Sequence, residues 1–225
     1  MHFSENGSHP RQRLLAELRR EGVRDERVLA AIRAVPRELF VPADHREQAY
    51  ENTPLPIGAG QTISQPLVVG LMTQALALRG SERVLEVGTG SGYQAAVLSR
   101  LAGWIVSVER IPELADRARS ALAALGCRNV EVHVSNGSLG WPRGAPYDAI
   151  VVAAAAPAVP PPLAEQLGEG GRLVLPVGSR VSQDLVLVRR RGTRTETRSL
   201  GPVRFVPLLG EAGWPAGEDE EPPPS

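Results

Sequence analysis

Short apolar segments alternate with helical stretches between residues 83 and 177, and this alternation limits the possible folds more than any other feature of the chain. Strands that alternate with helices form a parallel sheet whose two faces the helices cover. We therefore predict an α/β fold built on a doubly wound, mostly parallel sheet. The expected strands are Arg83–Val87, Ile105–Val108, Val130–Val134, Ala149–Val152 and Arg172–Val177, and the expected helices between them are Tyr93–Leu101, Glu113–Leu125 and Pro162–Leu167.

The segments on either side of this core have different patterns. Residues 10–34 have the spacing of two short helices, residues 35–65 are rich in proline and glycine, and a further helix begins at Pro66 and continues to Leu78. After residue 180 the helices stop, and a turn at Gly192 predicts an antiparallel strand pair. The expected C-terminal strands are Leu185–Val188, Arg194–Leu200 and Val203–Val206.

We therefore expect one domain over residues 12–210. Its parts are an N-terminal helical and loop region (12–80), a ligand-binding core (81–180) and C-terminal strands (181–210). Residues 1–11 are expected to be flexible. Residues 211–225 are acidic and rich in proline, which predicts a disordered tail.

Composition excludes several classes of function. Lys+Arg and Asp+Glu both number 25, and a net charge of zero argues against binding nucleic acid or anionic membranes by bulk charge. Cys127 is the only cysteine, so a disulfide framework or a multi-thiolate metal site within one chain is excluded. All basic residues are arginine, which rules out lysine nucleophiles and bases. No secretory signal or membrane span is visible, and we expect a cytoplasmic, metal-free monomer.

The strongest local signal is the segment Val84–Gly92 (VLEVGTGSG), in which a strand leads into three glycines and then a helix. Glycines at such a turn let a ligand approach the backbone closely. A dinucleotide fingerprint would need its third glycine at the position of Tyr93, so a nicotinamide-dependent oxidoreductase is disfavoured. The pattern favours an adenosine-containing ligand without a pyrophosphate, although a purely structural turn is the alternative.

Two further segments end at the same predicted sheet edge. Glu109 ends the second strand, where an acid can bind a ribose diol, and its alternative is a solvated charge paired with Arg110. Asn136 and Gly137 follow the third strand. Ligands of open α/β sheets bind at this carboxyl edge, which favours a ligand role for these residues.

Seven blocks together resemble the protein-L-isoaspartate O-methyltransferases, which are class I S-adenosylmethionine-dependent enzymes. The segment QTISQP within the second block is the most diagnostic, because methyltransferases of other substrate classes lack it. The resemblance implies a Rossmann-like sheet of the class I methyltransferase type with an N-terminal helical cap. The blocks are Val35–Pro42 (VPRELFVP), Leu55–Pro66 (LPIGAGQTISQP), Val84–Gly92, Val108–Arg110, Pro146–Val152 (PYDAIVV), Gly170–Gly178 (GGRLVLPVG) and Arg204–Leu208 (RFVPL).

The resemblance implies methyl transfer from S-adenosylmethionine to the free α-carboxylate of an L-isoaspartyl residue, with S-adenosylhomocysteine as the other product. The methyl ester re-forms a succinimide, which returns the damaged chain to aspartate. Isoaspartyl polypeptides are thus the expected partners, and Ser64 is the implied catalytic residue. The implied substrate-binding residues are Thr62, Ile63, Gln65 and Val206, and the implied cofactor-binding residues are Glu86, Gly88, Thr89, Gly90, Gly92, Glu109, Arg110, Asn136 and Gly137.

The chemistry needs little from the protein besides alignment. A carboxylate with an ordinary pKa near 4 is ionised at neutral pH, so it attacks without a general base. Ser64 then orients one carboxylate oxygen and is not itself a nucleophile. The alternative for Ser64 is an N-cap of the helix that begins at Pro66.

Two departures from the family pattern bear on function. The family usually carries Gly-Asp-Gly where this chain has Ser135, Asn136 and Gly137, and that aspartate is expected to accept a hydrogen bond from the adenine amino group. Asn136 offers only a neutral carbonyl, so we expect weaker cofactor binding. Leu67 replaces an aromatic residue or histidine. The alternatives are therefore an enzyme that esterifies a normal aspartate in a dedicated peptide, and a cofactor-binding paralogue with little catalysis.

Overall fold

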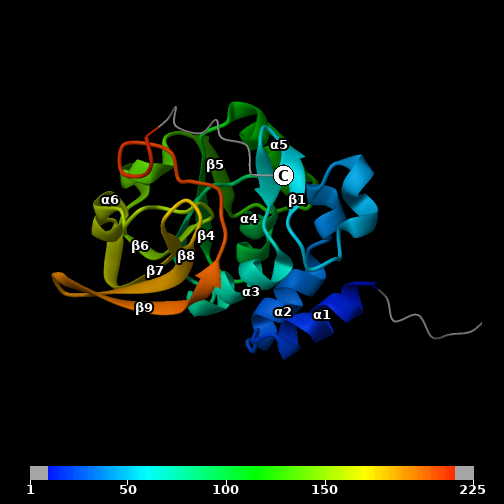
Figure 1. Ribbon diagram of the computed structural model, residues 1–225, viewed down its shortest axis with the longest axis horizontal. Coiled ribbons are helices and arrows are strands. Elements are labelled where there is room, and N and C mark those ends of the chain that lie inside the picture. The colour runs from blue at the N-terminus through cyan, green and yellow to red at the C-terminus, as the bar shows by residue number, and fades with distance from the viewer. Residues whose placement is uncertain (1–9, 216–225) are drawn as a thin grey trace, which may run out of the picture.

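The computed structural model describes residues 10–215, which fold around one seven-stranded sheet (Figure 1). The strands are β3 (Arg83–Val87), β4 (Trp104–Glu109), β5 (Val130–Val134), β6 (Tyr147–Val152), β7 (Leu167–Gly178), β8 (Gln183–Arg191) and β9 (Arg194–Val203). Their order is β5-β4-β3-β6-β7-β8-β9, and only the pairs β7–β8 and β8–β9 are antiparallel. The order reverses between β3 and β6, and such a switch point is where ligands of open α/β sheets bind.

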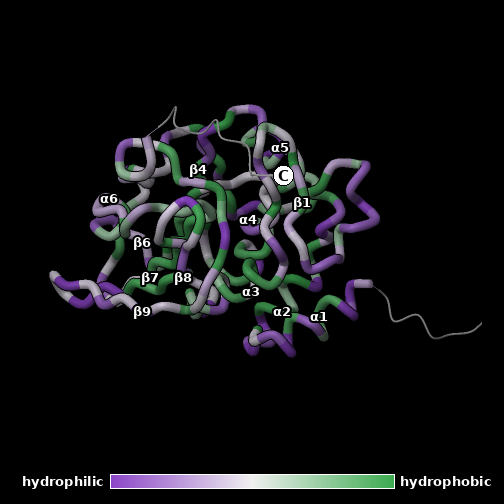
Figure 2. The backbone as a smooth tube through the Cα atoms, in the orientation of Figure 1, coloured by the Kyte–Doolittle hydropathy of each residue, from purple (hydrophilic) through white to green (hydrophobic). Residues whose placement is uncertain are grey.

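Helices cover the two faces of the sheet unequally. The helices α3 (Pro66–Ala75), α4 (Tyr93–Leu98) and α5 (Pro112–Ala124) lie on one face, and α6 (Pro161–Glu165) lies on the other with two 3-10 turns. Each strand contributes side chains to the hydrophobic clusters on both faces, because successive side chains point to opposite faces of a sheet. Val84 and Ile105 pack with α3 and α4, whereas Leu85 and Val106 pack with Leu163 of α6. Hydrophobic segments accordingly concentrate in the centre of the molecule (Figure 2).

An N-terminal layer packs onto the helical face. The helices α1 (Pro10–Arg20) and α2 (Glu26–Ala34) bury Leu18 and Leu29 in a cluster that includes Leu114 of α5. Asp25 caps α2, since its side chain accepts a hydrogen bond from the Arg27 amide at 2.9 Å. This layer corresponds to the helical cap that the sequence predicts.

A two-stranded hairpin follows where the sequence predicts only loop. Its strands are β1 (Leu55–Gly58) and β2 (Gln61–Ile63), and they are joined by a two-residue turn at Ala59 and Gly60. Both turn residues have positive φ, +52° and +68°, which is the geometry of a tight hairpin. Leu55, Ile57 and Ile63 alternate inward, and they anchor the hairpin in the core.

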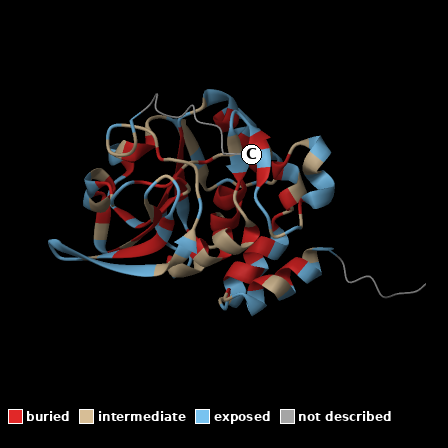
Figure 3. Ribbon diagram, in the orientation of Figure 1, coloured by how far each residue is buried: buried red, intermediate tan, exposed pale blue. Residues whose placement is uncertain are grey.

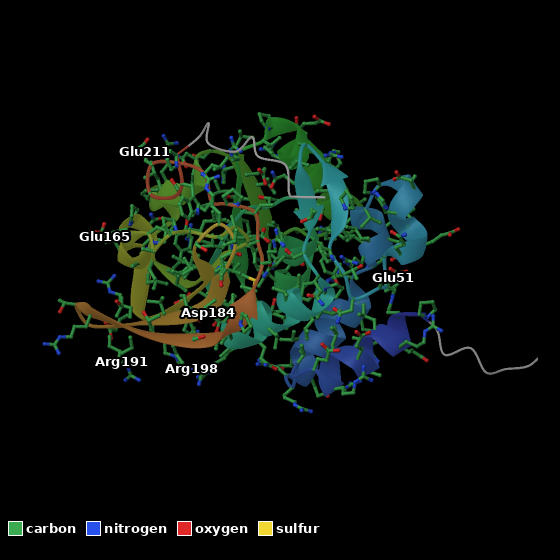
Figure 4. All side chains as sticks on the ribbon, in the orientation of Figure 1. Glu51, Glu165, Asp184, Arg191, Arg198 and Glu211 are labelled. Atoms are coloured by element: carbon green, nitrogen blue, oxygen red, sulfur yellow. The ribbon has the colours of Figure 1, made fainter. Side chains whose placement is uncertain are left out.

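The C-terminal strands form a long arm that extends beyond the body of the sheet (Figure 1). The far part of the arm is exposed (Figure 3), and Arg191 and Arg198 lie along it (Figure 4). The predicted separate strand Val203–Val206 is wrong, because Val203 is the last residue of β9 and residues 204–206 are not in a strand. A β-bulge in β9, opposite Leu185 and Val186 of β8, shifts the register of the pair. This extra residue interrupts the alternation of apolar and polar residues that marks a strand in the sequence.

Other predicted boundaries shift by a few residues. The helix predicted at Tyr93–Leu101 ends at Leu98. The helix predicted at Pro162–Leu167 is α6, and it ends at Glu165 because β7 already begins at Leu167. The predicted flexible and disordered ends lie mostly outside the described residues. Within them, α1 begins at Pro10, and residues 211–215 continue an ordered turn that pairs Leu209 with Trp214. No helix within residues 10–215 is long and apolar enough to cross a bilayer.

Candidate active site

The loops that follow β3, β4 and β5 meet at the carboxyl edge of the sheet, as the sequence predicts. Gly88 and Gly90 adopt φ of +90° and +53°, values that an L side chain rarely tolerates, so the turn after β3 requires glycine. Gly137 packs onto the end of β3, where a Cβ atom would lie 2.6 Å from the Cγ1 of Val87. The segments carrying residues 88–92 and 136–137 therefore lie side by side.

Glu109 fixes the glycine turn from the neighbouring strand. Its Oε2 accepts a hydrogen bond from the Gly90 amide at 2.8 Å, and its Oε1 accepts one from the Ile111 amide at 3.0 Å. The side chain is only 5% exposed. The carboxylate is thus held at the edge of the sheet with each oxygen retaining acceptor capacity, as a ribose diol would need. Glu109 is buried and Arg110 is exposed. The alternative prediction, a solvated Glu109 paired with Arg110, is therefore wrong.

A buried polar chain lies beneath the same turn. Thr89 Oγ1 and Ser107 Oγ are 2.6 Å apart, and the Ser107 hydroxyl donates to Glu86 Oε2. Glu86 is completely buried, and its Oε1 has no hydrogen-bond partner among the described residues. Burial, with a smaller contribution from the charge of Glu109, raises the pKa of Glu86 to about 8. Glu86 and Thr89 therefore support the turn from below.

The amide of Asn136 has a defined orientation. Its Oδ1 accepts hydrogen bonds from the Ser138 amide at 3.1 Å and from the Ser138 hydroxyl at 2.9 Å. The Ser138 amide can only donate, so Asn136 must turn its carbonyl oxygen, and not its nitrogen, toward Ser138. The Ala212 amide in turn donates to the Ser138 hydroxyl at 3.2 Å. The carbonyl expected to receive the adenine amino group is thus used within the protein, and Nδ2 has no hydrogen-bond partner among residues 10–215.

The hairpin β1–β2 lies against the glycine turn. A Cβ atom on Gly90 would be 3.5 Å from Ile57 Cδ1, and Arg117 of α5 donates to the Ile57 carbonyl at 2.8 Å. Ser64 follows β2 directly, so the predicted catalytic serine lies at the end of the hairpin that packs against the glycine turn.

Ser64 is not the cap of α3. Asn52 performs that function from a distant segment, because its Oδ1 accepts a hydrogen bond from the Leu67 amide at 3.0 Å. The residue at the N-cap position, Gln65, makes no side-chain cap hydrogen bond. The hydroxyl of Ser64 has no hydrogen-bond partner among the described residues and is partly exposed, so it is free for a ligand.

The other predicted substrate residues have different surroundings. Thr62 is exposed on the hairpin, whereas Ile63 is buried in the core beneath it. Gln65 donates from Nε2 to the Asn52 carbonyl at 2.8 Å, which holds the loop together. Val206 lies beside the end of β6, where its carbonyl accepts from the Ala155 amide at 2.8 Å.

Sequence reasoning missed two residues that organise this region, Asn52 and Arg37. Arg37 is fully buried, and its guanidinium donates to the Ser64 carbonyl at 3.1 Å. Burial lowers its pKa to about 10, so it stays charged at neutral pH. Arg37 lies in the block VPRELFVP, and its membership of this family block was the signal that could have identified it. Asn52 has no comparable signal, since its role depends on contacts with distant segments.

A cavity of about 340 Å³ at the opposite, amino-terminal edge of the sheet is a poor candidate site. It is lined by Arg79, Glu82, Asp148 and Arg172, among others. Its acids are engaged structurally, since Glu82 accepts from the Arg79 amide and Asp148 from the Arg83 amide, both at 2.8 Å. Within residues 10–215, no group of three or more His, Cys, Asp or Glu side chains could hold a metal ion.

The doubly wound sheet with its glycine turn, acidic strand end and antiparallel C-terminal strands defines the class: it is the fold of the class I S-adenosylmethionine-dependent methyltransferases. Within that class, the chain belongs to the protein-L-isoaspartate(D-aspartate) O-methyltransferase family, whose model matches residues 9–213.

Individual relatives agree with this assignment. The protein-L-isoaspartate O-methyltransferase of Methanoculleus marisnigri is 59% identical over 88% of this chain and 90% of its own length. Protein-L-isoaspartate O-methyltransferase 2 of Pelobacter propionicus is 57% identical over 93% and 94%. A solved protein-L-isoaspartate O-methyltransferase superposes with a TM-score of 0.82 at 31% identity, over 90% of this chain and 67% of that one. A Plasmodium falciparum structure, described as a putative member in complex with S-adenosyl-L-homocysteine, has a TM-score of 0.78 at 24% identity, covers 90% and 99% of the two chains, and supports the fold alone.

Proposed function

We propose that this chain transfers a methyl group from S-adenosylmethionine to the free α-carboxylate of L-isoaspartyl residues in damaged polypeptides, which starts their repair through a succinimide. The observation that carries the proposal is the free hydroxyl of Ser64, at the end of the hairpin that packs against the glycine turn, in a chain of this family. The relatives at 59% and 57% identity bear the name of that activity.

The residues at the sheet edge fit the cofactor. The turn at Gly88 and Gly90 exposes backbone that a ligand can approach, and Glu109 presents a fixed carboxylate to a ribose. The buried Oε1 atom of Glu86 has no hydrogen-bond partner within residues 10–215, so it is a further polar atom beneath the turn. When bound, the cofactor supplies an electrophilic methyl group.

The protein's own contribution is to bind and orient the substrate carboxylate. That group is ionised at neutral pH, so no residue needs to remove a proton. Ser64 donates its hydroxyl hydrogen to one carboxylate oxygen and leaves the other free to attack. Fixing two reactants in this way lowers a barrier by roughly 7–11 kcal/mol.

The substrate is expected to lie between the hairpin and the C-terminal segment. Thr62 is exposed on the hairpin, and the segment from Val203 to Leu208 crosses the same sheet edge, where the Leu208 amide donates to the Ala155 carbonyl at 2.7 Å. An extended peptide clamped between these segments would present its isoaspartyl carboxylate to Ser64. We further propose that the enzyme acts as a monomer in the cytoplasm.

A methyl-transfer assay with paired synthetic peptides tests the proposal. One peptide contains isoaspartate and the other contains aspartate at the same position, and both are incubated with labelled S-adenosylmethionine. We expect methylation of the isoaspartyl peptide alone. Methylation of the aspartyl peptide would indicate an enzyme that modifies normal aspartate, and cofactor binding without turnover would indicate a non-catalytic paralogue. Either result would overturn the proposal.

A further inference from the structure

Arg37 is a completely buried cation surrounded by backbone carbonyl groups. Its Nη1 donates to the carbonyl oxygens of Ala49 at 2.8 Å and Glu51 at 3.5 Å. Its Nη2 donates to those of Thr53 at 3.0 Å and Ser64 at 3.1 Å. One guanidinium therefore fastens the whole segment that leads from the N-terminal layer to the hairpin, and the last of its contacts is the backbone of the proposed catalytic residue.

The same guanidinium contacts the cofactor half of the site. Its central carbon lies 5.8 Å from the centre of the Tyr93 ring, within the range of a cation–π interaction. Tyr93 is the first residue of α4 and follows Gly92 of the glycine turn. Arg37 thus joins the Ser64 loop to the helix that begins at the end of the glycine turn.

The charge of Arg37 is not neutralised by an acid. Within residues 10–215 no ion pair links it to a carboxylate, and its Nε has no hydrogen-bond partner. The neighbouring acid Glu38 instead pairs with Arg11 and accepts a hydrogen bond from Tyr50. Burying an unpaired charge is costly. Such a charge acts strongly on an anion bound nearby, because the interior screens it less than water does.

We propose that Arg37 is a positioning residue for the methyl transfer: it holds the backbone of Ser64 at a fixed place relative to the glycine turn, and its charge favours a carboxylate at that serine. This inference rests on the proposed function. A neutral side chain of similar size would fill the space, but it could neither bind the four carbonyl groups nor attract the substrate anion.

Three variants test the inference. Arg37→Met removes the charge and all the hydrogen bonds, and Arg37→Lys keeps the charge but loses the planar fork. Arg11→Met is the matched control. Arg11 also lies over a tyrosine, with its central carbon 5.0 Å from the centre of the Tyr50 ring, and it donates to the Arg33 carbonyl at 3.1 Å. Unlike Arg37, it makes no contact with the Ser64 segment.

For Arg37→Met we expect kcat to fall at least about tenfold and KM for an isoaspartyl peptide to rise, with the Kd of S-adenosylhomocysteine within threefold of the original. Arg37→Lys should have an intermediate kcat and a nearly unchanged KM. Arg11→Met should keep kcat within twofold, even where its melting temperature falls. Amide hydrogen exchange of residues 62–65 should accelerate in both Arg37 variants and not in the control.

A kcat per folded molecule that is unchanged in both Arg37 variants, well below their melting temperatures, would overturn the inference, because a merely structural residue lowers stability alone. A parallel loss of S-adenosylhomocysteine affinity would also overturn it, since the effect would then lie in the cofactor site. If Arg37→Met does not fold, Arg37→Lys decides the matter. If the original protein transfers no methyl group, the proposed function fails, but the exchange of residues 62–65 still tests the positioning.

Discussion

Glu109 holds Gly90: the carboxylate at the end of β4 accepts the amide of the glycine turn at 2.8 Å, across two neighbouring strands. The same carboxylate accepts the Ile111 amide at the start of α5. The acid is therefore in place before any ligand arrives, and it organises the turn that the ligand would meet.

Replacing this acid should damage cofactor binding. Glu109→Gln keeps only one acceptor for the two amides of Gly90 and Ile111, and it turns an amide donor toward the other. We expect the Kd of S-adenosylhomocysteine, measured by calorimetry, to rise about ten- to a hundredfold, which corresponds to about 1.4–2.8 kcal/mol. Glu113→Gln is the control, because Glu113 is an exposed acid in the first turn of α5. Equal affinities in the two variants would contradict a role for Glu109.

The free hydroxyl of Ser64 predicts a separation of stability from catalysis. Ser64→Ala should change the free energy of unfolding by less than about 0.5 kcal/mol, since no intramolecular hydrogen bond is lost. Its kcat should fall roughly ten- to a hundredfold, with S-adenosylhomocysteine affinity unchanged. Asn52→Ala should show the opposite signature in urea unfolding, a loss of about 1 kcal/mol, because it removes the cap of α3. A stability loss in Ser64→Ala as large as in Asn52→Ala would refute this division.

Asn136 should reduce affinity for the adenine amino group, if the base lies at this loop. Its acceptor oxygen faces Ser138, so its free end is a donor, and a donor does not bind an amino group well. Asn136→Asp should therefore bind S-adenosylhomocysteine about three- to tenfold more tightly, in competition assays as in calorimetry. The 6-oxo analogue, S-inosylhomocysteine, should lose affinity in the variant. Unchanged or weaker binding of S-adenosylhomocysteine by the variant would contradict the idea that the amide donor of Asn136 opposes the adenine amino group.

The buried carboxyl of Glu86 should make stability depend on pH. Its pKa is about 8 in the folded state against 4.5 in the unfolded chain, so between those values only the folded state holds the proton. Stability from this group therefore falls as pH rises from about 5 to 8, by up to about 1.4 kcal/mol per pH unit. Glu86→Gln should remove that decline, as urea unfolding at several pH values would reveal. Identical pH profiles for the two proteins would rule this origin out.

The hairpin turn carries local strain that a substitution can relieve. Ala59 has a φ of +52°, is exposed, and precedes a glycine. Asparagine tolerates this conformation better, and Asn-Gly is a preferred pair in such turns. Ala59→Asn should therefore raise the free energy of unfolding by about 0.5–1 kcal/mol in thermal or urea unfolding. Ala59→Val should lower it, and a stabilising effect of valine would contradict the strain.

Much of the core could be predicted from the sequence because buried parallel strands have a strong local signal. The strands β3 and β5 begin and end at the predicted residues, Arg83–Val87 and Val130–Val134. The hairpin β1–β2 was missed because each strand is very short and Pro54, Pro56 and Gly58 indicate a loop. The bulge in β9 was missed because it breaks the alternation that identifies a strand.

The site likewise divides into residues that a local motif predicts and residues that only the tertiary fold brings together. Residues in contiguous motifs, such as Gly90 and Glu109, occur at the predicted edge of the sheet. Asn52 and Arg37 could not be assigned a role, because their hydrogen-bond partners lie 12 to 35 residues away in sequence and only the tertiary fold brings them together. The orientation of Asn136 follows a local Asx turn, since its Oδ1 accepts the amide two residues later, but the contact between Ala212 and Ser138 spans 74 residues and has no local signal.

That last contact has a consequence for how the protein is made. The turn around Trp214 touches Ser138 through Ala212, and Gly210 packs onto Asn136 so closely that a Cβ atom there would lie 2.3 Å from Oδ1. During synthesis, residues near position 214 leave the ribosome after the rest of the domain has been exposed to fold. A nascent chain therefore lacks these contacts until residues 210–214 have emerged, and truncation before residue 210 would leave a well-formed sheet without the packing of Gly210 on Asn136 and the hydrogen bond from Ala212 to Ser138.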